Sequence, residues 1–411
     1  MDANPRTLLI TLSGSDRPGV TRQLFESLSQ RSVEVLDVEQ LVVRGRLVLA
    51  VLVSLDADES GMESVRDSVL VTARELGMDV ETVPGAAEDD ERRRNRIHIT
   101  LMGAPLLPDA VAAAAAEIAD RGGNIDRIRR IASYPVTAIE FQGSGVAVES
   151  LRRPLAAVAA AHGADIAVQE ADIDRRGQYL VVMDVDSTFI QDEVIDLLAD
   201  EAGVLPQVAE ITERAMAGEL DFEQSLRARV ALLSGLPVEA LDRVRARVTL
   251  TPGARTLCRT LTRLGYRVAL VSGGFTRIIA PIAADLGVTD VRANTLEVDD
   301  GALTGQVIGP VIDRLGKRAA LEGFAAQYGI PVRRTVAIGD GANDIDMLEA
   351  AGLGIAFNAK AAAQDAADAS VNVPYLDSVL FLMGITREEI ESADAKDGLP
   401  PADRDLRVEG A

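Results

Sequence analysis

Residues 179–191 constrain the fold more than any other stretch, because they read YLVVMDVDSTFIQ. The short apolar run rich in Val predicts a strand buried on both faces, as in a parallel sheet. Asp184 and Asp186 follow it directly, and buried ionised carboxylates are costly unless they are compensated. Ligands bind at the carboxyl ends of strands in open α/β sheets, so we predict a Mg²⁺ site here, with one carboxylate as nucleophile. The same letters also suit a helix cap formed by Asp186 or Ser187.

The composition is that of a globular protein with about two to three domains. The chain has 411 residues and a formal net charge of −22, which argues against nucleic acids and anionic membranes as partners. Cys258 is the only cysteine, so an intramolecular disulfide and a thiolate metal cluster are excluded. We expect a cytoplasmic location, because the sequence shows neither a signal peptide nor an apolar run long enough to span a bilayer.

The N-terminal part contains an internal repeat. Residues 5–84 show the order strand, helix, strand, strand, helix, strand, which is the ferredoxin-like pattern. The same order returns over residues 96–172, after a charged stretch at 88–96 that reads as a linker. Each copy is small for a core of its own, so we expect the copies to pack on each other or on a second chain.

The first copy resembles the ACT domains, which bind amino acids. Its loop reads GSDRPGV at residues 14–20, as in the first turn of that family. The resemblance implies that Asp16 and Gly19 contact a regulatory amino acid, with serine as a feedback ligand, and that the modules form a homodimer. The second copy reads GAPLLPDAV at 103–111 and lacks this signature. The alternative is that both copies serve dimerisation alone.

Two further apolar runs end in polar residues. Residues 266–274, YRVALVSGG, place Ser272 and Gly273 at a strand end ahead of a helix, where a hydroxyl and backbone amides suit a phosphate. Residues 335–347, TVAIGDGANDIDM, place Asp340 after a third apolar strand, at the sheet edge expected for Asp184. Between these runs, Lys317 begins a helix and supplies a cation that could balance a phosphate. A lone lysine is also common on a solvated surface.

Together these stretches resemble the four motifs of the haloacid dehalogenase superfamily, in its order and spacing: DVDST, VSGG, Lys317 and GDGAND. The resemblance spans residues 178–385 and implies a doubly wound parallel sheet. It implies that Asp184 attacks phosphorus and forms an aspartyl-phosphate. It also implies that Asp186 first protonates the leaving alkoxide and then deprotonates water. Ion pumps of this superfamily need transmembrane helices, and its dehalogenases lack the second carboxylate, so Asp186 favours phosphoryl transfer.

The same resemblance implies the other roles in the site. Mg²⁺ is expected between Asp184, the backbone carbonyl of Asp186, and Asp340. Three groups are expected to hold the phosphate oxygens, namely Ser272, Gly273 and Lys317. Asn343 is expected to orient the phosphate or Ser272, and Asp344 to support Lys317 or a metal-bound water.

The insertion at about 190–250 reads as four helices, which in this superfamily form a cap over the substrate. Glu193 can pair with an ammonium group and Arg229 with a carboxylate. Met216 and Phe222 can shield a small site. Glu193 could equally begin a helix, Arg229 could pair with a neighbouring acid, and Phe222 could belong to the core.

The cap sequence MAGELDFEQSLRARV resembles that of the phosphoserine phosphatases. This resemblance implies hydrolysis of O-phosphoserine to serine, the last step of serine synthesis. Two alternatives stay open: a phosphatase for another small phosphomonoester, such as phosphothreonine, and an amino-acid-sensing regulator with an inactive phosphatase domain. Residues 386–411 are polar and acidic and read as a loosely held tail.

Overall fold

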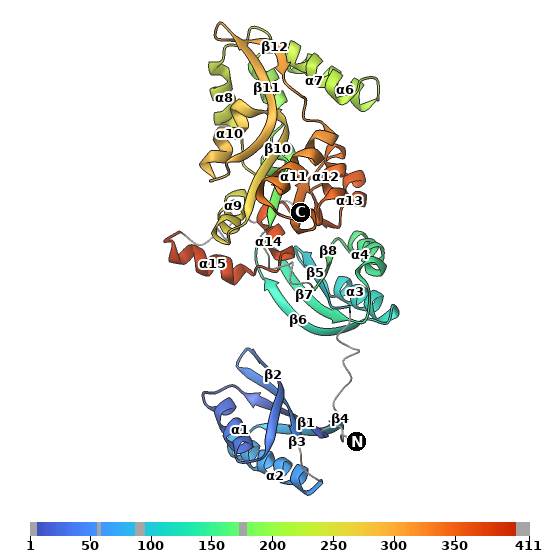
Figure 1. Ribbon diagram of the computed structural model, residues 1–411, viewed down its shortest axis with the longest axis vertical. Helices are drawn as coiled ribbons and strands as arrows, with labels where there is room; N and C mark the ends of the chain where they lie inside the picture. Colours follow the sequence, from blue (N-terminus) through green and yellow to red (C-terminus); the bar gives the residue numbers. More distant parts are fainter. Residues whose placement is uncertain (1–5, 56–58, 87–94, 172–178, 400–411) are drawn as a thin grey trace. The chain divides into compact units, whose positions relative to one another are not determined.

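The computed structural model describes residues 6–55, 59–86, 95–171 and 179–399 (Figure 1). The chain divides into two compact units, residues 1–92 and residues 93–411. Most of the predicted linker and the predicted boundary at 172–178 lie outside the described residues.

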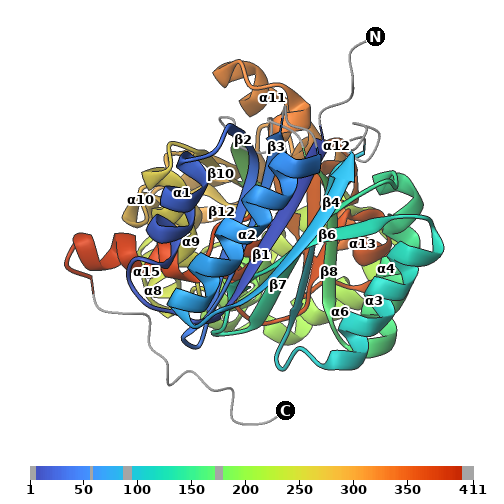
Figure 2. The same cartoon turned by 90° about the horizontal axis from the view of Figure 1, so that it is seen from below.

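The first unit is one antiparallel sheet with two helices on one face (Figure 2). The sheet order is β2-β3-β1-β4. Alternate residues of β1, Leu8, Ile10 and Leu12, are fully buried beneath the helices. The elements are β1 (Arg6–Ser15), α1 (Val20–Ser29), β2 (Val33–Val43), β3 (Arg46–Leu55), α2 (Glu59–Leu76) and β4 (Asp79–Ala86).

The second unit begins with the repeat of this module. Its strands lie in the equivalent order, β8-β5-β7-β6, and two helices cover one face. The elements are β5 (Ile97–Gly103), α3 (Pro108–Asp120), β6 (Asn124–Ala132), β7 (Thr137–Ser144), α4 (Val148–His162) and β8 (Asp165–Glu170). Both copies therefore have the predicted ferredoxin-like order.

A larger sheet forms the rest of the unit, and it is parallel except at one edge. Its order is β12-β11-β10-β9-β13-β14-β15, with only β12 antiparallel to its neighbour β11. The predicted doubly wound parallel sheet is confirmed. Its strands are β9 (Leu180–Met183), β10 (Arg267–Phe275), β11 (Asp290–Asp299), β12 (Ala302–Ile308), β13 (Thr335–Gly339), β14 (Leu353–Phe357) and β15 (Ala369–Val371).

The two sheets of this unit join into one. Ala167 of β8 pairs with Ala369 of β15 in an antiparallel bridge, so the eleven strands form a continuous sheet. This junction was not part of the sequence-based prediction, because single-strand patterns do not specify which edges pair.

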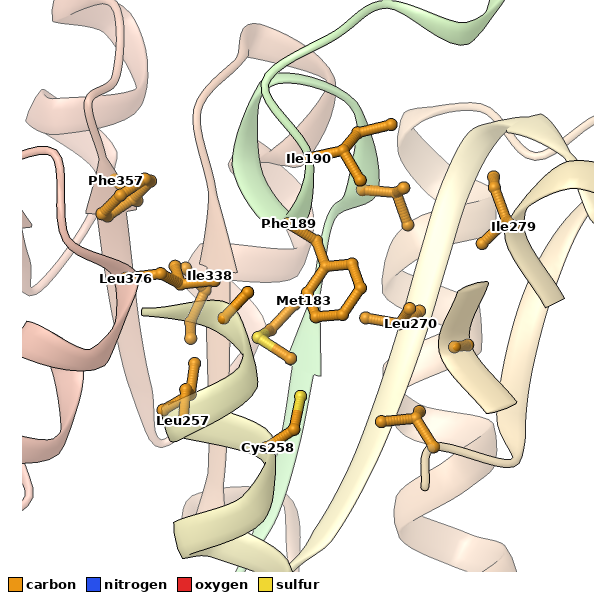
Figure 3. Packing of buried hydrophobic residues seen from close by; sticks show 14 of the residues in the cluster. Met183, Phe189, Ile190, Leu257, Cys258, Leu270, Ile279, Ile338, Phe357 and Leu376 are labelled. Atoms are coloured by element: carbon orange, nitrogen blue, oxygen red, sulfur yellow. The ribbon is translucent and has the colours of Figure 1, made fainter. Parts of the chain in front are cut away.

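Helices cover both faces of the parallel sheet, and β9 alternates between them. Val181 and Met183 pack with Leu257 and Cys258 of one face (Figure 3). Leu180 and Val182 belong to the opposite cluster. Burial of each large aliphatic side chain contributes about 1.5–3 kcal/mol. The covering helices are α9 (Ala254–Arg263), α10 (Thr276–Asp285), α11 (Arg314–Tyr328), α12 (Ile345–Ala350) and α13 (Ala361–Ala366).

The segment between β9 and β10 carries four further helices: α5 (Val194–Glu201), α6 (Leu205–Met216), α7 (Phe222–Ala231) and α8 (Glu239–Arg247). Arg227 of α7 donates to the Val307 carbonyl of β12 at 3.1 Å, so these helices contact the β11–β12 hairpin. Among the described helices, none is both long and apolar enough to cross a membrane.

The C-terminal region differs from the prediction of a loosely held tail. After α14 (Val379–Leu382), residues Arg387–Lys396 form helix α15. Thr386 begins it with a capping box to Glu389. Asp394 accepts hydrogen bonds from Arg259 at 2.6 and 2.9 Å. Ion pairs provide much of this contact, so the polar composition of the region does not indicate that it packs on the domain. Residues 400–411 lie outside the described part of the chain.

Candidate active site

An irregular turn positions the first acid. Strand β9 ends at Met183, and the Asp184 amide donates to the Ile338 carbonyl of β13 at 2.9 Å. The Asp184 carboxylate accepts from the Val185 amide at 2.7 Å, which fixes one of its oxygens. Within the turn η3 (Val185–Phe189), Ser187 has a φ of 58°, a left-handed conformation that is uncommon for a side chain other than Gly or Asn. The strand therefore delivers Asp184, buried, to the rim of the sheet.

Three carboxylates meet at this rim. Asp184, Asp340 and Asp344 each offer an oxygen, and these oxygens lie within 4.8 Å of one another. Burial, followed by the charge of Asp344, raises the pKa of Asp184 well above its ordinary value. Burial also raises the pKa of Asp340. Burial and mutual repulsion oppose the ionisation of these clustered carboxyl groups. A hard divalent cation bound between their oxygens would compensate the negative charge of the ionised forms.

The carboxylate of Asp186 lies outside this cluster and has other partners. Oδ1 accepts from the Val194 amide at 2.8 Å, and Oδ2 accepts from the Ser272 hydroxyl at 2.8 Å. Burial raises the pKa of this carboxyl group. The predicted metal set included Asp186 only through its backbone carbonyl, and the third carboxylate of the cluster is Asp344.

Lys317 supplies a cation at the centre of the acids. Its side chain is 1% exposed, and Nζ lies 2.7 Å from both Asp184 Oδ1 and Asp344 Oδ1. Burial alone would lower the pKa of Lys317, but the two carboxylates raise it above its ordinary value. Asp313 caps the helix that carries Lys317 by accepting from the Gly316 amide at 2.7 Å. The hydrogen bond from Lys317 Nζ to Asp344 Oδ1 is the contact expected if Asp344 supports Lys317.

Strand β10 delivers the Ser-Gly-Gly segment beside Asp186. Ser272 is fully buried, and its hydroxyl accepts from the Gly274 amide at 2.7 Å while donating to Asp186. A Cβ atom on Gly273 would approach Phe222 Cζ to 3.1 Å, so the ring of the cap helix α7 lies against this loop. Asn343 is half-buried on the turn η5 (Ala342–Asp344), next to the acid cluster.

The cap residues are placed unequally. Glu193 accepts from the Ser187 hydroxyl at 2.9 Å. Loss of hydration and then the charge of Asp186 raise the pKa of Glu193 to about 7. Met216, at the end of α6, is 74% exposed, so its predicted shielding role is not visible in this arrangement.

Arg229 is half-buried on α7 and faces the acids. Burial lowers the pKa of its guanidinium, while Asp196, Glu193 and Asp186 oppose this effect. Its hydrogen bond within the described part of the chain is a long one of 3.4 Å to the Ser225 carbonyl, and no acid in that part lies within 4.0 Å. A pairing with Glu223 is absent, because Glu223 pairs with Arg227.

Sequence reasoning missed two polar residues that hold this site. The Thr188 hydroxyl donates to Asp340 at 3.3 Å. Asn294 of β11 donates to the Gly273 carbonyl at 2.8 Å. A buried asparagine within a strand was the available signal, but the partner could not be read from the strand pattern.

The predicted ligand loop of the first module lies within the first unit. Gly19 has a φ of 97° and precedes α1, a conformation that favours glycine. The Asp16 amide donates to the Gly45 carbonyl at 2.8 Å, and the Asp16 side chain is exposed. Contact of these two residues with an amino acid stays a prediction.

The parallel sheet and its rim of acids define a hydrolase of the haloacid dehalogenase type. The model for haloacid dehalogenase-like hydrolases matches residues 181–349, and two ACT domain models match residues 6–83 and 97–169. The chain belongs to the phosphoserine phosphatase family within this class. It is 56% identical over 389 residues to the phosphoserine phosphatase of Streptomyces coelicolor, covering 94% of each chain. It is 51% identical over 393 residues to the phosphoserine phosphatase SerB2 of Mycobacterium tuberculosis, covering 95% of this chain and 96% of that one.

Among solved structures, the chain resembles a probable phosphoserine phosphatase from Vibrio cholerae in its unliganded form. The TM-score is 0.57 at 34% identity, over 76% of this chain and 91% of that one. A haloacid dehalogenase family hydrolase from Salmonella enterica gives a TM-score of 0.62 at 27% identity, over 70% of this chain and 98% of that one.

Proposed function

We propose that the chain hydrolyses O-phospho-L-serine to L-serine and phosphate through an aspartyl-phosphate on Asp184, as the last step of serine biosynthesis. The observation that carries this proposal is the pairing of two sites. A buried carboxylate lies 2.7 Å from Lys317 at the rim of the sheet, and the adjoining cap presents Glu193 beside a half-buried Arg229.

Asp184 acts as the nucleophile. The Val185 amide and Lys317 Nζ both contact its Oδ1 atom at 2.7 Å, which orients the carboxylate. Lys317 is also the cation that offsets repulsion between an anionic carboxylate and an anionic phosphate. Ser272 and Gly273 hold the phosphate oxygens, with Asn343 at the neighbouring turn.

Asp186 acts as acid and then as base. Its raised pKa keeps a proton available for the serine alkoxide as the phosphorus–oxygen bond breaks. The resulting carboxylate then takes a proton from the water that attacks the aspartyl-phosphate. Its contacts with Val194 and Ser272 hold it on the leaving-group side during both steps.

Mg²⁺ is the proposed cofactor, held by Asp184, Asp340 and the backbone carbonyl of Asp186, with Asp344 adjacent. When bound, Mg²⁺ neutralises charge on the phosphate and on the nucleophile. The support is the set of three clustered carboxylate oxygens, which matches the preference of Mg²⁺ for hard donors.

Substrate choice follows from two charged groups in the cap. Arg229 binds the serine carboxylate and Glu193 binds the ammonium group. Phe222 lies over Gly273 and excludes water from this side of the site, whereas Met216 is too exposed to take part in this cover. A phosphate-release assay over phosphoserine, phosphothreonine and p-nitrophenyl phosphate tests the assignment. A higher rate on another phosphomonoester would change the substrate assignment. If no substrate released phosphate, the result would favour a sensing regulator with an inactive phosphatase domain.

The N-terminal modules supply a homodimer interface and an amino-acid site in this proposal. Edge strand β2 exposes several large apolar side chains in the first unit, namely Val35, Leu36, Val38, Leu41, Val42 and Val43. An apolar edge of this kind invites pairing with a second copy. Serine is the proposed feedback ligand at Asp16 and Gly19. Light scattering and serine titration by calorimetry test the two parts separately.

The domain organisation belongs to the same proposal: ACT modules at 5–84 and 96–172, a catalytic domain at 178–385, and its cap at about 190–250. A cytoplasmic location remains a prediction from the sequence.

A further inference from the structure

Asn294 connects two parts of the active site that are distant in sequence. It lies on β11 and is 1% exposed. Its Nδ2 donates to the Gly273 carbonyl at 2.8 Å, and its Oδ1 accepts from the Ile312 amide at 2.8 Å. Both ends of the amide are thus paired inside the protein, where a lost partner is costly.

The first contact holds the peptide unit between Gly273 and Gly274. In a planar trans peptide the carbonyl and the following amide point in opposite directions. Asn294 binds the carbonyl, and the Gly274 amide donates to the Ser272 hydroxyl at 2.7 Å. Ser272 in turn donates to Asp186 at 2.8 Å. One chain of hydrogen bonds therefore runs from Asn294 through the phosphate-binding loop to the acid–base residue.

The second contact holds the segment that leads to Lys317. The Ile312 amide binds Asn294, and the next residue, Asp313, caps the helix that carries Lys317. The Lys317 amide donates to the Asp313 carbonyl at 2.9 Å. Asn294 consequently fixes the spacing between the loop and the cation, both of which contact the same phosphate in the proposed mechanism.

We infer that Asn294 is a positioning residue for phosphate binding, acting through Gly273 and Ile312 without touching the substrate. The inference rests on the proposed phosphatase function. It concerns the phosphoryl group alone, so its loss affects all phosphomonoester substrates equally.

Two variants and one control test this inference. Asn294→Asp keeps the acceptor for Ile312 and places an oxygen against the Gly273 carbonyl, whereas Asn294→Leu removes both hydrogen bonds at similar volume. Thr276→Val is the matched control, because the Thr276 hydroxyl donates to the Ala293 and Asn294 carbonyls at 3.0 and 3.1 Å and anchors the same strand without binding the loop.

The measurements are calorimetric titration with inorganic phosphate in the presence of Mg²⁺, kcat/KM on phosphoserine and p-nitrophenyl phosphate, and the thermal midpoint. We expect both Asn294 variants to weaken phosphate binding about tenfold or more. They should lower kcat/KM by the same factor on both substrates. Thr276→Val should lower the midpoint and leave phosphate binding unchanged.

Phosphate affinity within twofold of the unmodified protein in the Asn294 variants would overturn the inference. An equal loss in Thr276→Val would also overturn it, because the effect would then be general to the strand. If Asn294→Asp does not fold, Asn294→Ser gives the same readouts without a buried charge. Failure of the unmodified chain to hydrolyse phosphoserine would reject the proposed function, whereas the titration with phosphate would still report on Asn294.

Discussion

Replacing Arg229 with alanine tests the substrate assignment most directly. Arg229 is half-buried, its guanidinium faces the acids of the site, and no acid in the described residues lies within 4.0 Å of it. An incoming carboxylate therefore meets a cation that pairs with no acid in the described part of the chain, and its one hydrogen bond there is the long contact with the Ser225 carbonyl. We expect Arg229→Ala to lose most of its activity on phosphoserine.

The size of the effect follows from the lost contact. A hydrogen bond to a charged group contributes about 1.5–3 kcal/mol. Each 1.4 kcal/mol is about a factor of ten, so kcat/KM on phosphoserine should fall about 10- to 100-fold. Phosphoethanolamine keeps the phosphate and the ammonium group but has no carboxylate, so its kcat/KM should change less than about threefold.

The assay is phosphate release from both substrates under identical conditions. Arg227→Ala is the control, because Arg227 lies on the same helix but pairs with Glu223 and the Val307 carbonyl. It should leave the ratio of the two kcat/KM values unchanged. Equal losses on phosphoserine and phosphoethanolamine in Arg229→Ala would refute the carboxylate role.

Four further outcomes are expected. Asp184→Asn should abolish phosphate release, and a rate near that of the unmodified protein would exclude the covalent route. Chelation with EDTA should abolish activity and added Mg²⁺ should restore it; unchanged activity would contradict the proposed metal. Burial raises the pKa of Asp165 to about 6, so the folded state holds the proton more tightly than the unfolded state, and the free energy of unfolding should fall by up to about 3 kcal/mol as the pH rises from about 4 to 7. Urea titrations should show that Asp165→Asn lacks this component, and equal slopes would contradict it. Asp394→Ala should lower the thermal midpoint by several degrees, because it leaves Arg259 and Arg263 without their shared partner; an unchanged midpoint would show that these ion pairs add no stability.

The sequence predicted the parallel sheet well because its signals are local. An apolar run followed directly by Asp184, and another followed by Asp340, required only the chain itself to predict strands and their ends. The structure brings these two residues together with Lys317. Their roles stay proposals.

Other features depend on contacts between distant segments. Asn294 is hydrogen-bonded to residues 21 and 18 positions away, and a strand pattern does not reveal such partners. The sequence does not reveal that helix α15 packs on the domain, because charged side chains make much of its contact. Asp344 completes the acid cluster only because its turn folds back over Gly339, where a Cβ would lie 2.4 Å from the Asp344 carboxyl carbon.

Through the bridge between Ala167 and Ala369, the second module covers the edge strand β15 of the catalytic sheet. A truncation that begins at the catalytic strand would remove this neighbour of β15 and expose the part of the common core that the catalytic region now shares with Met102, Val136 and Ala138. An edge strand with unpaired backbone groups pairs readily with strands of other molecules. The shortened chain should consequently self-associate more readily than the full chain, and aggregation is the expected result of removing the N-terminal modules.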